Sequence, residues 1–333
     1  MISLLDWLES QKTSEGAYLG ICNTFWEFNP VKFPHTTNQA GMINGFVNLY
    51  KHSKDKKWLK KAEEAADYLI SKIDENFFYT IAYGDSPSGP WPDSGPVLQA
   101  IPDLSLLRLY FINNKEKYKK VAEENINFTL KKWFNNGHYH VNNQTAKVSE
   151  VLLLLNRKRE AVEAGEFLVT QHTQLGGLRQ SIRDERVFSY YNAKCVPGLI
   201  YLYKHTGDER FLNSALKVGH FLEKMQDRKT GLFYNDYEAP LRWTKFMKWS
   251  NLWVLRKKPM WVARSFNILY AMRLLSEFDS FNIDFDKLLA YQKKDGSFPN
   301  TVGFGKERDG LSTTRWNVYA FEYLTKYYPE RFL

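Results

Sequence analysis

The chain has 333 residues, with 46 Lys and Arg against 37 Asp and Glu, and its formal net charge is +9. Hydrophobic residues make up 44% and charged residues 25%, which excludes an intrinsically disordered chain. No apolar run approaches the ~20 residues that span a bilayer, and residues 1–6 lack the features of a secretory signal. We therefore expect a cytoplasmic protein without a membrane partner.

The strongest signal along the chain is an internal repeat. Residues 49–62 and 202–215 align without a gap, and residues 109–124 follow the same pattern. In each copy an apolar helix ends, a short polar turn follows, and an aromatic residue such as Trp58 or Phe211 opens an amphipathic helix. Each copy therefore predicts a helical hairpin.

Helical periodicity extends this hairpin over the whole chain. In chain order, mostly apolar helices are expected at about 38–53, 95–112, 145–156, 189–206, 260–277 and 312–328. Amphipathic helices alternate with them at about 2–11, 57–73, 115–134, 157–173, 208–226 and 282–293. Apolar helices suit an inner ring, and helices with one wet face suit an outer ring. The pattern predicts an all-α fold, an (α/α)6 toroid that forms one domain over residues 1–333.

A second recurring element is a glutamine followed, four or five residues later, by a glycine. It occurs as Gln11–Gly16, Gln171–Gly176, Gln226–Gly231 and Gln292–Gly296. Glycine readily adopts the left-handed conformation that ends many helices. Each glycine is therefore predicted to end an outer helix.

The connections between the predicted helices are of two kinds. The turns from an inner to an outer helix are short, such as 52–56 and 205–209. The connections from an outer to the next inner helix are long, at about 12–37, 74–94, 135–144, 174–188, 227–259 and 294–311. In a toroid all the long connections lie at one end, and long loops in compact domains usually carry function. We expect the site at this long-loop end, over the N-termini of the inner helices.

Aromatic residues reach 16% of the chain, with 10 Trp and 20 Tyr, and many fall in the long connections. Rings with a polar tip suit a wet cleft in which sugar faces stack while polar side chains bind hydroxyl groups. The predicted substrate-binding residues are Trp26, His35, Trp91, His138, Tyr139, Arg183, Tyr191, Trp243, Arg264, Arg315 and Trp316. The alternative for each tryptophan is that its ring only packs the loops together.

Two carboxylates are candidates for acid–base chemistry. Asp93 precedes the predicted inner helix at 95–112, and Asp184 lies between Arg183 and Arg186. Hydrolysis of a glycoside needs one carboxyl group to protonate the leaving oxygen and often a second to activate water. We therefore predict Asp93 and Asp184 as catalytic residues. The alternatives are that Asp93 only caps its helix and that Asp184 only forms surface ion pairs.

The charge of the long connections favours an acidic sugar as the partner. The connection at 227–259 holds eight Lys and Arg against three Asp and Glu, and guanidinium groups bind carboxylates in a forked geometry. The alternative is a solvated basic loop. Lysines elsewhere are scattered along helices, so no nucleic acid is expected. Two cysteines and histidines without ligand spacing predict no metal, and no glycine-rich phosphate loop predicts a cofactor.

Two segments carry a resemblance to a known family. Residues 203–212 resemble the hairpin turn of the six-hairpin glycosidase superfamily, in which a tyrosine precedes Thr-Gly-Asp and Phe-Leu follows. The run Trp-Pro-Asp-Ser at 91–94, followed by Pro102, is similar to the motif of unsaturated glucuronyl and rhamnogalacturonyl hydrolases. The resemblance implies an (α/α)6 toroid, hydrolysis of a glycoside, and a general acid/base role for Asp93. Those families usually have a bulky apolar residue where this chain has Ser94.

The first interpretation is thus a glycoside hydrolase that acts on a uronate-containing oligosaccharide. A polysaccharide lyase or a uronate or sugar epimerase on the same scaffold is the main alternative, in which a Tyr or His removes the proton beside the acid. A terpenoid-cyclase-like toroid is suggested by the run Gln-Lys-Lys-Asp-Gly-Ser-Phe at 292–298. The last alternative is a glycan-binding protein without catalysis, in which the acids only cap helices.

Overall fold

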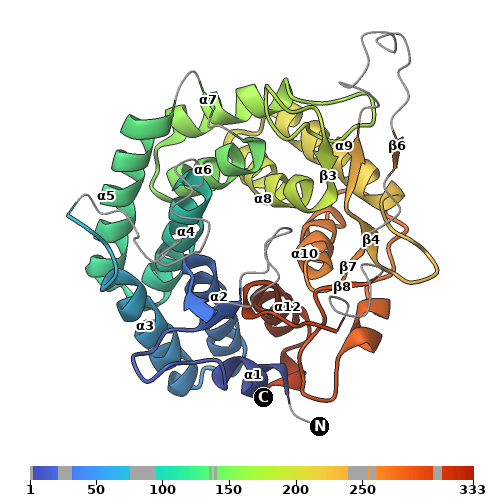
Figure 1. The fold of residues 1–333 in the computed structure, drawn as a ribbon. Helices are drawn as coiled ribbons and strands as arrows, with labels where there is room; N and C mark the ends of the chain where they lie inside the picture. Colours follow the sequence, from blue (N-terminus) through green and yellow to red (C-terminus); the bar gives the residue numbers. More distant parts are fainter. Residues whose placement is uncertain are drawn as a thin grey trace.

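The inner ring of helices surrounds the axis of the molecule (Figure 1). The computed structural model describes residues 3–21, 32–75, 95–134, 137–138, 141–238, 254–255, 260–302 and 310–333. The inner helices are α2 (Thr36–Ser53), α4 (Gly95–Asn113), α6 (Asn142–Leu154), α8 (Ser189–Thr206), α10 (Ser265–Leu275) and α12 (Thr314–Tyr327). Each packs against the next, and α12 packs against α2, so the ring closes as the sequence predicts. None of the helices in the described ranges is long and apolar enough to cross a membrane.

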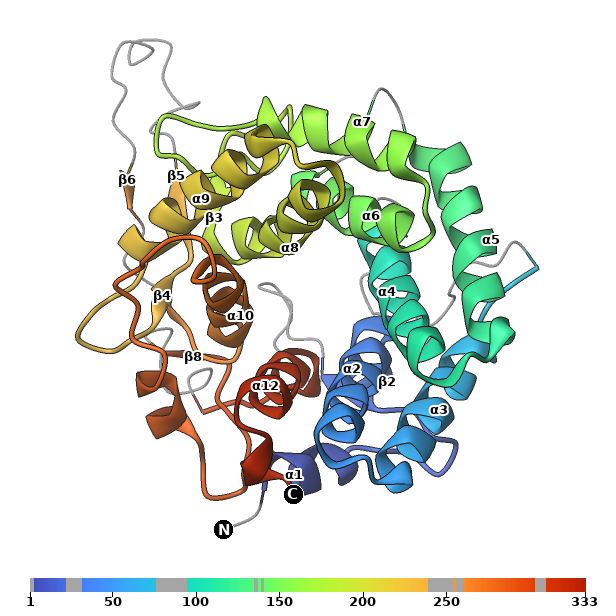
Figure 2. The same cartoon turned by 180° about the vertical axis from the view of Figure 1, so that it is seen from behind.

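The outer helices lie around this ring, as both views show (Figures 1 and 2). They are α1 (Leu4–Glu9), α3 (Lys56–Ile70), α5 (Glu116–Trp133), α7 (Lys158–Val169) and α9 (Glu209–Lys224), with short 3-10 helices η2 (Lys287–Tyr291) and η3 (Pro329–Arg331). Their amphipathic pattern buries one face, as Trp58, Ala62 and Leu69 do on α3. The first helix is shorter than predicted because Ser3 and Asp6 form a capping box that begins it.

The prediction of an amphipathic α-helix at 282–293 is wrong. Only η2 is helical there, and it is a 3-10 helix. The Gln226 side chain accepts from the Asp284 backbone N–H at 3.1 Å and donates to its carbonyl at 3.1 Å. Both backbone groups of Asp284 are therefore engaged by another part of the chain, and an α-helix cannot include them.

The short turns between inner and outer helices repeat at atomic detail. Each contains one residue with a left-handed backbone: Lys54 at φ 58°, Asn114 at 55°, Asn156 at 59° and Gly207 at 72°. In two of these turns an aspartate then caps the outer helix. Asp55 accepts from the Lys57 backbone N–H, and Asp208 accepts from that of Arg210, both at 2.9 Å. Segments 49–62 and 202–215 are thus equivalent hairpins, as predicted.

The recurring glycines do not end the outer helices, contrary to the prediction. Helix α7 ends at Val169, and Gly176 follows later, in a tight turn closed by a bridge between His172 and Leu178. Gly16 lies in a similar bridged turn beyond the end of α1, and Gly231 lies in one beyond the end of α9. All have positive φ, so the glycine serves a small hairpin just beyond each helix.

The long connections hold the strands of the structure. Strand β1 (Leu19–Ile21) pairs antiparallel with β2 (Lys32–Pro34). A second sheet has the order β3 (Val187–Phe188), β5 (Asp236–Glu238), β6 (Val254–Leu255), and a third has β4 (Phe233–Tyr234), β7 (Met260–Trp261), β8 (Thr301–Val302). Every described strand lies between an outer helix and the next inner helix, so the sheets build the long-loop end.

Buried asparagines of the inner helices fasten these connections. Asn192 on α8 accepts from the Leu178 backbone N–H at 2.6 Å and donates to the carbonyl oxygens of Leu178 and Phe188, both at 2.9 Å. Asn317 on α12 holds both backbone groups of Phe298 in the same way. These amides lie at the long-loop end but serve the fold, because their hydrogen bonds replace those a strand would supply.

Candidate functional site

The predicted residues Arg264 and Trp316 meet at the N-terminal ends of neighbouring inner helices. Arg264 immediately precedes α10, and Trp316 lies in the first turn of α12. The Arg264 guanidinium lies 3.7 Å from the centre of the Trp316 ring and 3.6 Å from that of Trp261, in strand β7. Tyr190, in the first turn of α8, has its ring 5.2 Å from the same guanidinium. The four residues form the cation–aromatic cluster.

This packing changes the role expected for Trp316. Its side chain is buried, with only 6% of the residue exposed, and Trp261 is 7% exposed. The ring face on which a sugar would stack is instead in contact with Arg264. The cation is half-buried, and contacts with two aromatic rings restrict the orientation of its planar guanidinium. The cluster is thus built to hold an arginine in one orientation.

A second cation lies one turn deeper in the barrel. Lys194 on α8 is 6% exposed, and its Nζ is 4.5 Å from the Tyr190 ring centre and 5.5 Å from that of Tyr319 on α12. The Tyr319 ring also stacks on Trp316, with centres 6.1 Å apart. Aromatic rings therefore join Lys194 to the cation–aromatic cluster.

The predicted carboxylate Asp184 lies in a tight turn that its own backbone closes with Ser181. Its side chain accepts hydrogen bonds from both Nε and Nη2 of Arg186, and the distance from Arg186 Nη2 to Asp184 Oδ2 is 2.6 Å. The Arg186 guanidinium covers the Phe188 ring at 5.1 Å. The surface ion pair considered as the alternative for Asp184 is therefore present in the structure.

The predicted residue Tyr191 links this turn to the cation–aromatic cluster. Its ring centre is 5.3 Å from that of Phe188 and 5.7 Å from that of Tyr190. A continuous series of side-chain contacts thus runs along the long-loop end. It leads from Asp184 through Arg186, Phe188 and Tyr191 to Tyr190.

The two predicted histidines are held by the fold in different ways. His35 is fully buried and caps α2, where its Nδ1 accepts from the Thr37 backbone N–H at 3.1 Å. That hydrogen bond places the ring proton on Nε2. The ring of His138 stacks on Phe167 of the outer helix α7, with centres 4.5 Å apart. His138 thus packs against the outer ring.

The remaining predicted residues are placed only in part. Arg183 is exposed in the turn next to Asp184. Arg315 lies in the first turn of α12, and its side chain is outside the description. The predicted residues Asp93, Trp26, Trp91, Tyr139 and Trp243 lie outside the described residues. Within the described part of the chain, no group of three His, Cys, Asp or Glu is placed to hold a metal ion.

Sequence reasoning missed four members of this region: Tyr190, Trp261, Lys194 and Tyr319. Trp261 was expected inside the helix predicted at 260–277, whereas α10 begins only at Ser265 and Trp261 lies in a strand. Tyr190 and Lys194 are four residues apart on α8, so they share one face. A search for charged residues one turn below aromatic residues on the inner helices would have found Lys194.

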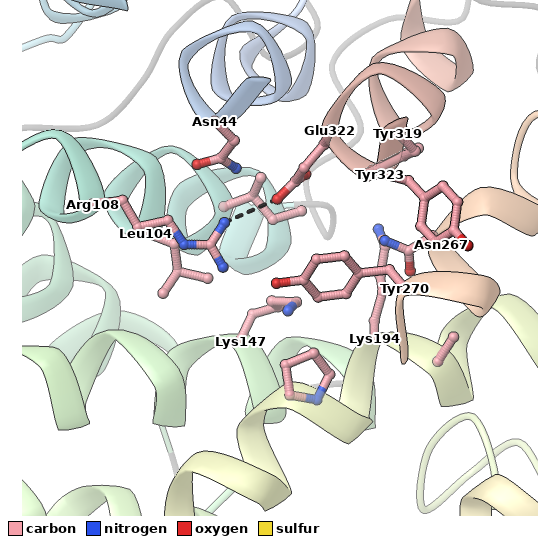
Figure 3. Close-up of a pocket in the computed structure, with 13 residues that line it drawn as sticks. Asn44, Leu104, Arg108, Lys147, Lys194, Asn267, Tyr270, Tyr319, Glu322 and Tyr323 are labelled. Atoms are coloured by element: carbon pink, nitrogen blue, oxygen red, sulfur yellow. Dashed lines mark hydrogen bonds and ion pairs between the residues drawn. The ribbon is translucent and has the colours of Figure 1, made fainter. Parts of the chain in front are cut away.

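A polar cavity of about 50 Å³ lies at the centre of the inner ring (Figure 3). Side chains from all of the inner helices line it, and the polar ones are Asn44, Arg108, Lys147, Lys194, Asn267, Tyr270, Tyr319, Glu322 and Tyr323. Arg108 Nη1 and Glu322 Oε1 are 3.0 Å apart across it. The barrel centre is therefore charged and hydrogen-bonding rather than an apolar core.

No protein-family model and no curated protein matches the sequence. Solved structures match nearly the whole chain. One is cellobiose 2-epimerase from Bacillus thermoamylovorans B4167, at 12% identity and TM-score 0.69, with 96% of this chain and 95% of that chain covered.

Two further structures are similar at comparable identity. An alpha-amylase from Clostridium perfringens matches at 16% identity and TM-score 0.67, with 98% and 97% of the two chains covered. A family 88 glycosyl hydrolase from Bacteroides vulgatus matches at 12% identity and TM-score 0.58, with 87% and 90% covered. The chain therefore has the (α/α)6 six-hairpin fold that its hairpin turns and their resemblance implied.

Proposed function

We propose that residues 1–333 form one domain that is a carbohydrate-active enzyme, a glycoside hydrolase acting on an acidic oligosaccharide at the long-loop end. The observation that carries the proposal is Arg264, whose guanidinium contacts the rings of Trp261 and Trp316 at the N-terminal ends of α10 and α12. A guanidinium can match a carboxylate with two parallel hydrogen bonds. A uronate carboxylate is the group on a sugar that a guanidinium fits in this way.

The parallel inner helices support the same substrate. All their N-termini lie at the long-loop end, and each N-terminus carries about half a positive charge. Arg264 and Lys194 add full charges in a half-buried or buried setting. An anionic sugar is thereby attracted to the end of the barrel where the long connections lie.

The proposed chemistry uses two carboxyl groups. Asp93 directly precedes the region where α4 begins, at Gly95, and it is assigned as the general acid that protonates the leaving glycosidic oxygen. Asp184 is assigned as the second carboxylate, which takes a proton from the attacking water or stabilises positive charge on the sugar ring. Arg186 forms an ion pair with it, and an adjacent cation favours the charged form of a carboxyl group, which suits a base better than an acid. The family 88 glycosyl hydrolase with the same fold supports hydrolysis as the reaction class.

A sugar epimerase or isomerase is the second candidate. Besides the cellobiose 2-epimerase, a D-mannose isomerase matches at 11% identity and TM-score 0.69, with 97% of this chain and 94% of that chain covered. These two matches span both chains almost entirely. Epimerisation requires a base that removes the proton beside a carbonyl group and returns it to the other face.

Incubation with unsaturated and saturated uronate oligosaccharides tests the proposal. A hydrolase removes the ultraviolet absorbance of the unsaturated sugar, because the freed product rearranges and loses its conjugated double bond. A lyase instead creates that absorbance from a saturated polymer. An epimerase changes neither signal but yields a second sugar in the NMR spectrum of a reducing substrate. Loss of absorbance, or release of a new reducing sugar from the saturated oligosaccharide, supports the hydrolase, and the absence of both excludes it.

A further inference from the structure

Below the cation–aromatic cluster, the barrel contains a group of charged residues that the proposed reaction does not use. It consists of Arg108 on α4, Lys147 and Glu150 on α6, Glu322 and Lys326 on α12, and Lys51 on α2. We call these six residues the central charge cluster. Arg108 lies in the C-terminal half of α4, and Lys51 and Lys326 lie in the last turns of their helices. The central charge cluster therefore extends toward the end of the barrel with the short turns.

Cations outnumber carboxylates in the central charge cluster by four to two. Arg108 pairs with Glu322 at 3.0 Å, and Lys147 pairs with Glu150. Lys326 Nζ donates to the Tyr270 hydroxyl at 3.1 Å. Among the described residues, Lys51 and Lys326 have no carboxylate within salt-bridge distance. Glu277, a carboxylate at the same end of the barrel, pairs instead with Lys204 at 2.9 Å. The positive charges of Lys51 and Lys326 lie outside the cavity lining, which itself contains Arg108, Lys147 and Lys194 against one carboxylate, Glu322.

The cations of the central charge cluster lie close enough to repel one another. Burial lowers the pKa of Lys51, and the positive charges of Arg108 and Lys326 lower it further. Burial and the charge of Arg108 likewise lower the pKa of Lys326, although Glu322 and Glu277 act in the opposite direction. The negative ends of the inner helices offset part of this repulsion, but only within the last turn of a helix. A bound anion would relieve the rest.

The cavity at the barrel centre provides the space (Figure 3). Arg108, Lys147, Tyr270 and Glu322 converge on it from different helices. Its volume of about 50 Å³ holds about four water-sized groups, at roughly 10–15 Å³ each. A tetrahedral oxyanion has four oxygens around one central atom, so it matches this volume.

The cavity region also contains hydrogen-bond acceptors that lack a donor. Asn44 is 6% exposed and lines the cavity, and among the described residues its Oδ1 has no hydrogen-bond partner. The same holds for Oε2 of the buried Glu150, which pairs with the cavity-lining Lys147 but does not itself line the cavity. Buried polar atoms are rarely left unsatisfied. A ligand that fits must therefore accept hydrogen bonds from the cations and also donate to Asn44.

We propose that the central charge cluster and its cavity bind a protonated oxyanion of the phosphate class, at a site below the proposed sugar site, with Lys194 between the two. Such an ion accepts from Arg108 and Lys147 through its charged oxygens and donates its P–OH to Asn44. Sulfate has the same shape and charge class but carries no proton at neutral pH, so it cannot donate. The source of the group is either free phosphate or the phosphate of a sugar phosphate.

Isothermal titration of the full chain with inorganic phosphate, sulfate and chloride at constant ionic strength tests this site. We expect phosphate to bind at least about 10-fold more tightly than sulfate, and chloride to be the weakest. Glucose 6-phosphate in a fourth titration separates the two sources, because it binds at least as tightly as phosphate only if the cavity admits the attached sugar. Equal heats for phosphate and chloride would overturn the proposal and leave the lysines as partners of the helix ends.

Variants locate the binding. Lys147→Gln should weaken phosphate binding about 10-fold or more, because it removes a charge-assisted hydrogen bond. Lys326→Gln, closer to the surface, should also weaken phosphate binding, but to a smaller extent. This second variant keeps the test valid if Lys147→Gln fails to fold. Asn44→Ala removes the cavity-lining acceptor that has no partner among the described residues, so the preference for phosphate over sulfate should be lost. Lys204→Gln is the matched control at the same end of the barrel.

The sugar site is tested separately in the same assay. Arg264→Lys should retain full phosphate binding, because Arg264 belongs to the cation–aromatic cluster and not to the central charge cluster. Phosphate binding that is unchanged in Lys147→Gln and Lys326→Gln would contradict the proposal, whatever the protein does to sugars.

Discussion

The guanidinium of Arg264 lies 3.7 Å from the ring centre of Trp316, although 51 residues separate the two along the chain. They meet because α10 and α12 are neighbours in the inner ring and both begin at the long-loop end. The ring of Trp261, tilted by 59° to that of Trp316, is also in contact with the cation, at 3.6 Å. Two aromatic contacts restrict the orientations of the guanidinium, whose planar fork matches flat anionic groups.

Asp93→Asn should lower the turnover of the true substrate by about 10²–10⁴-fold, the usual loss when a general acid or base is removed. Asparagine keeps any helix-capping role, so the folded state should be as stable as before. Steady-state kinetics and thermal unfolding measure the two effects. Asp208→Asn is the control, because Asp208 caps α9 at the other end of the barrel. Near-full turnover of Asp93→Asn would reduce Asp93 to a cap.

Gly207→Ala should destabilise the fold by about 1 kcal/mol, because an L-residue with a Cβ is strained in the left-handed conformation. The backbone of Gly207 has φ 72°, and an added Cβ would meet no atom within 4 Å, so only backbone strain is measured. Gly207→Asn should lose less, since Asn114 and Asn156 occupy the equivalent turns. Urea unfolding measures both. Gly310→Ala, equally open but without positive φ, should change little.

Asn192→Ala should cost about 2–4 kcal/mol of unfolding free energy. The substitution leaves the backbone N–H of Leu178 and two carbonyl groups without their hydrogen bonds in a buried place. Chemical denaturation gives the value. Asn213→Ala, on the exposed face of α9, should stay within about 0.5 kcal/mol of the parent protein. Equal effects of the two substitutions would show that the long connection does not depend on Asn192.

His172 should make the protein less stable in mild acid. Burial lowers the pKa of His172 below its usual value of 6.5, while Nδ1 lies 2.7 Å from the Gly176 carbonyl oxygen and Nε2 lies 2.7 Å from Ser214 Oγ. Below pH 6.5 the unfolded chain therefore binds a proton that the folded chain resists, and unfolding free energy falls with falling pH until the folded pKa is passed. His172→Gln should show a smaller decrease between pH 7.5 and pH 5.5. An identical decrease in both proteins would assign it to other groups.

The double ring could be predicted from the sequence because its signals are local. The equivalence of 49–62 and 202–215 follows from a turn whose left-handed residue and capping aspartate recur within a few positions. The segment at 282–293 was predicted as an α-helix because its apolar spacing is helical. The contact that prevents this helix comes from Gln226, which follows the end of α9 and binds the backbone of Asp284. No local sequence pattern reveals such a distant contact.

The candidate site could be predicted only as a location and a set of residue types. Arg264 and Trp316 were both expected at the long-loop end, and the structure places them there in contact. Their mutual stacking was not expected, because it depends on the position of α10 relative to α12. Trp261 was missed because helical spacing at 260–277 concealed the strand that presents it. Lys194 was missed because a lysine within an apolar helix appears in the sequence as one more surface charge.

Calorimetric titration with glucuronate and glucose, on the parent protein and on Arg264→Lys, tests the proposed acidic-sugar site most directly. Lysine keeps the charge but loses the fork and the stacking. The parent protein should bind glucuronate at least about 10-fold more tightly than glucose, and Arg264→Lys should lose that preference. Arg273→Lys, at the other end of α10 and stacked on Phe285 at 3.9 Å, should keep it. Equal affinity of the parent protein for both sugars, or an undiminished preference in Arg264→Lys, would contradict the proposed role of Arg264.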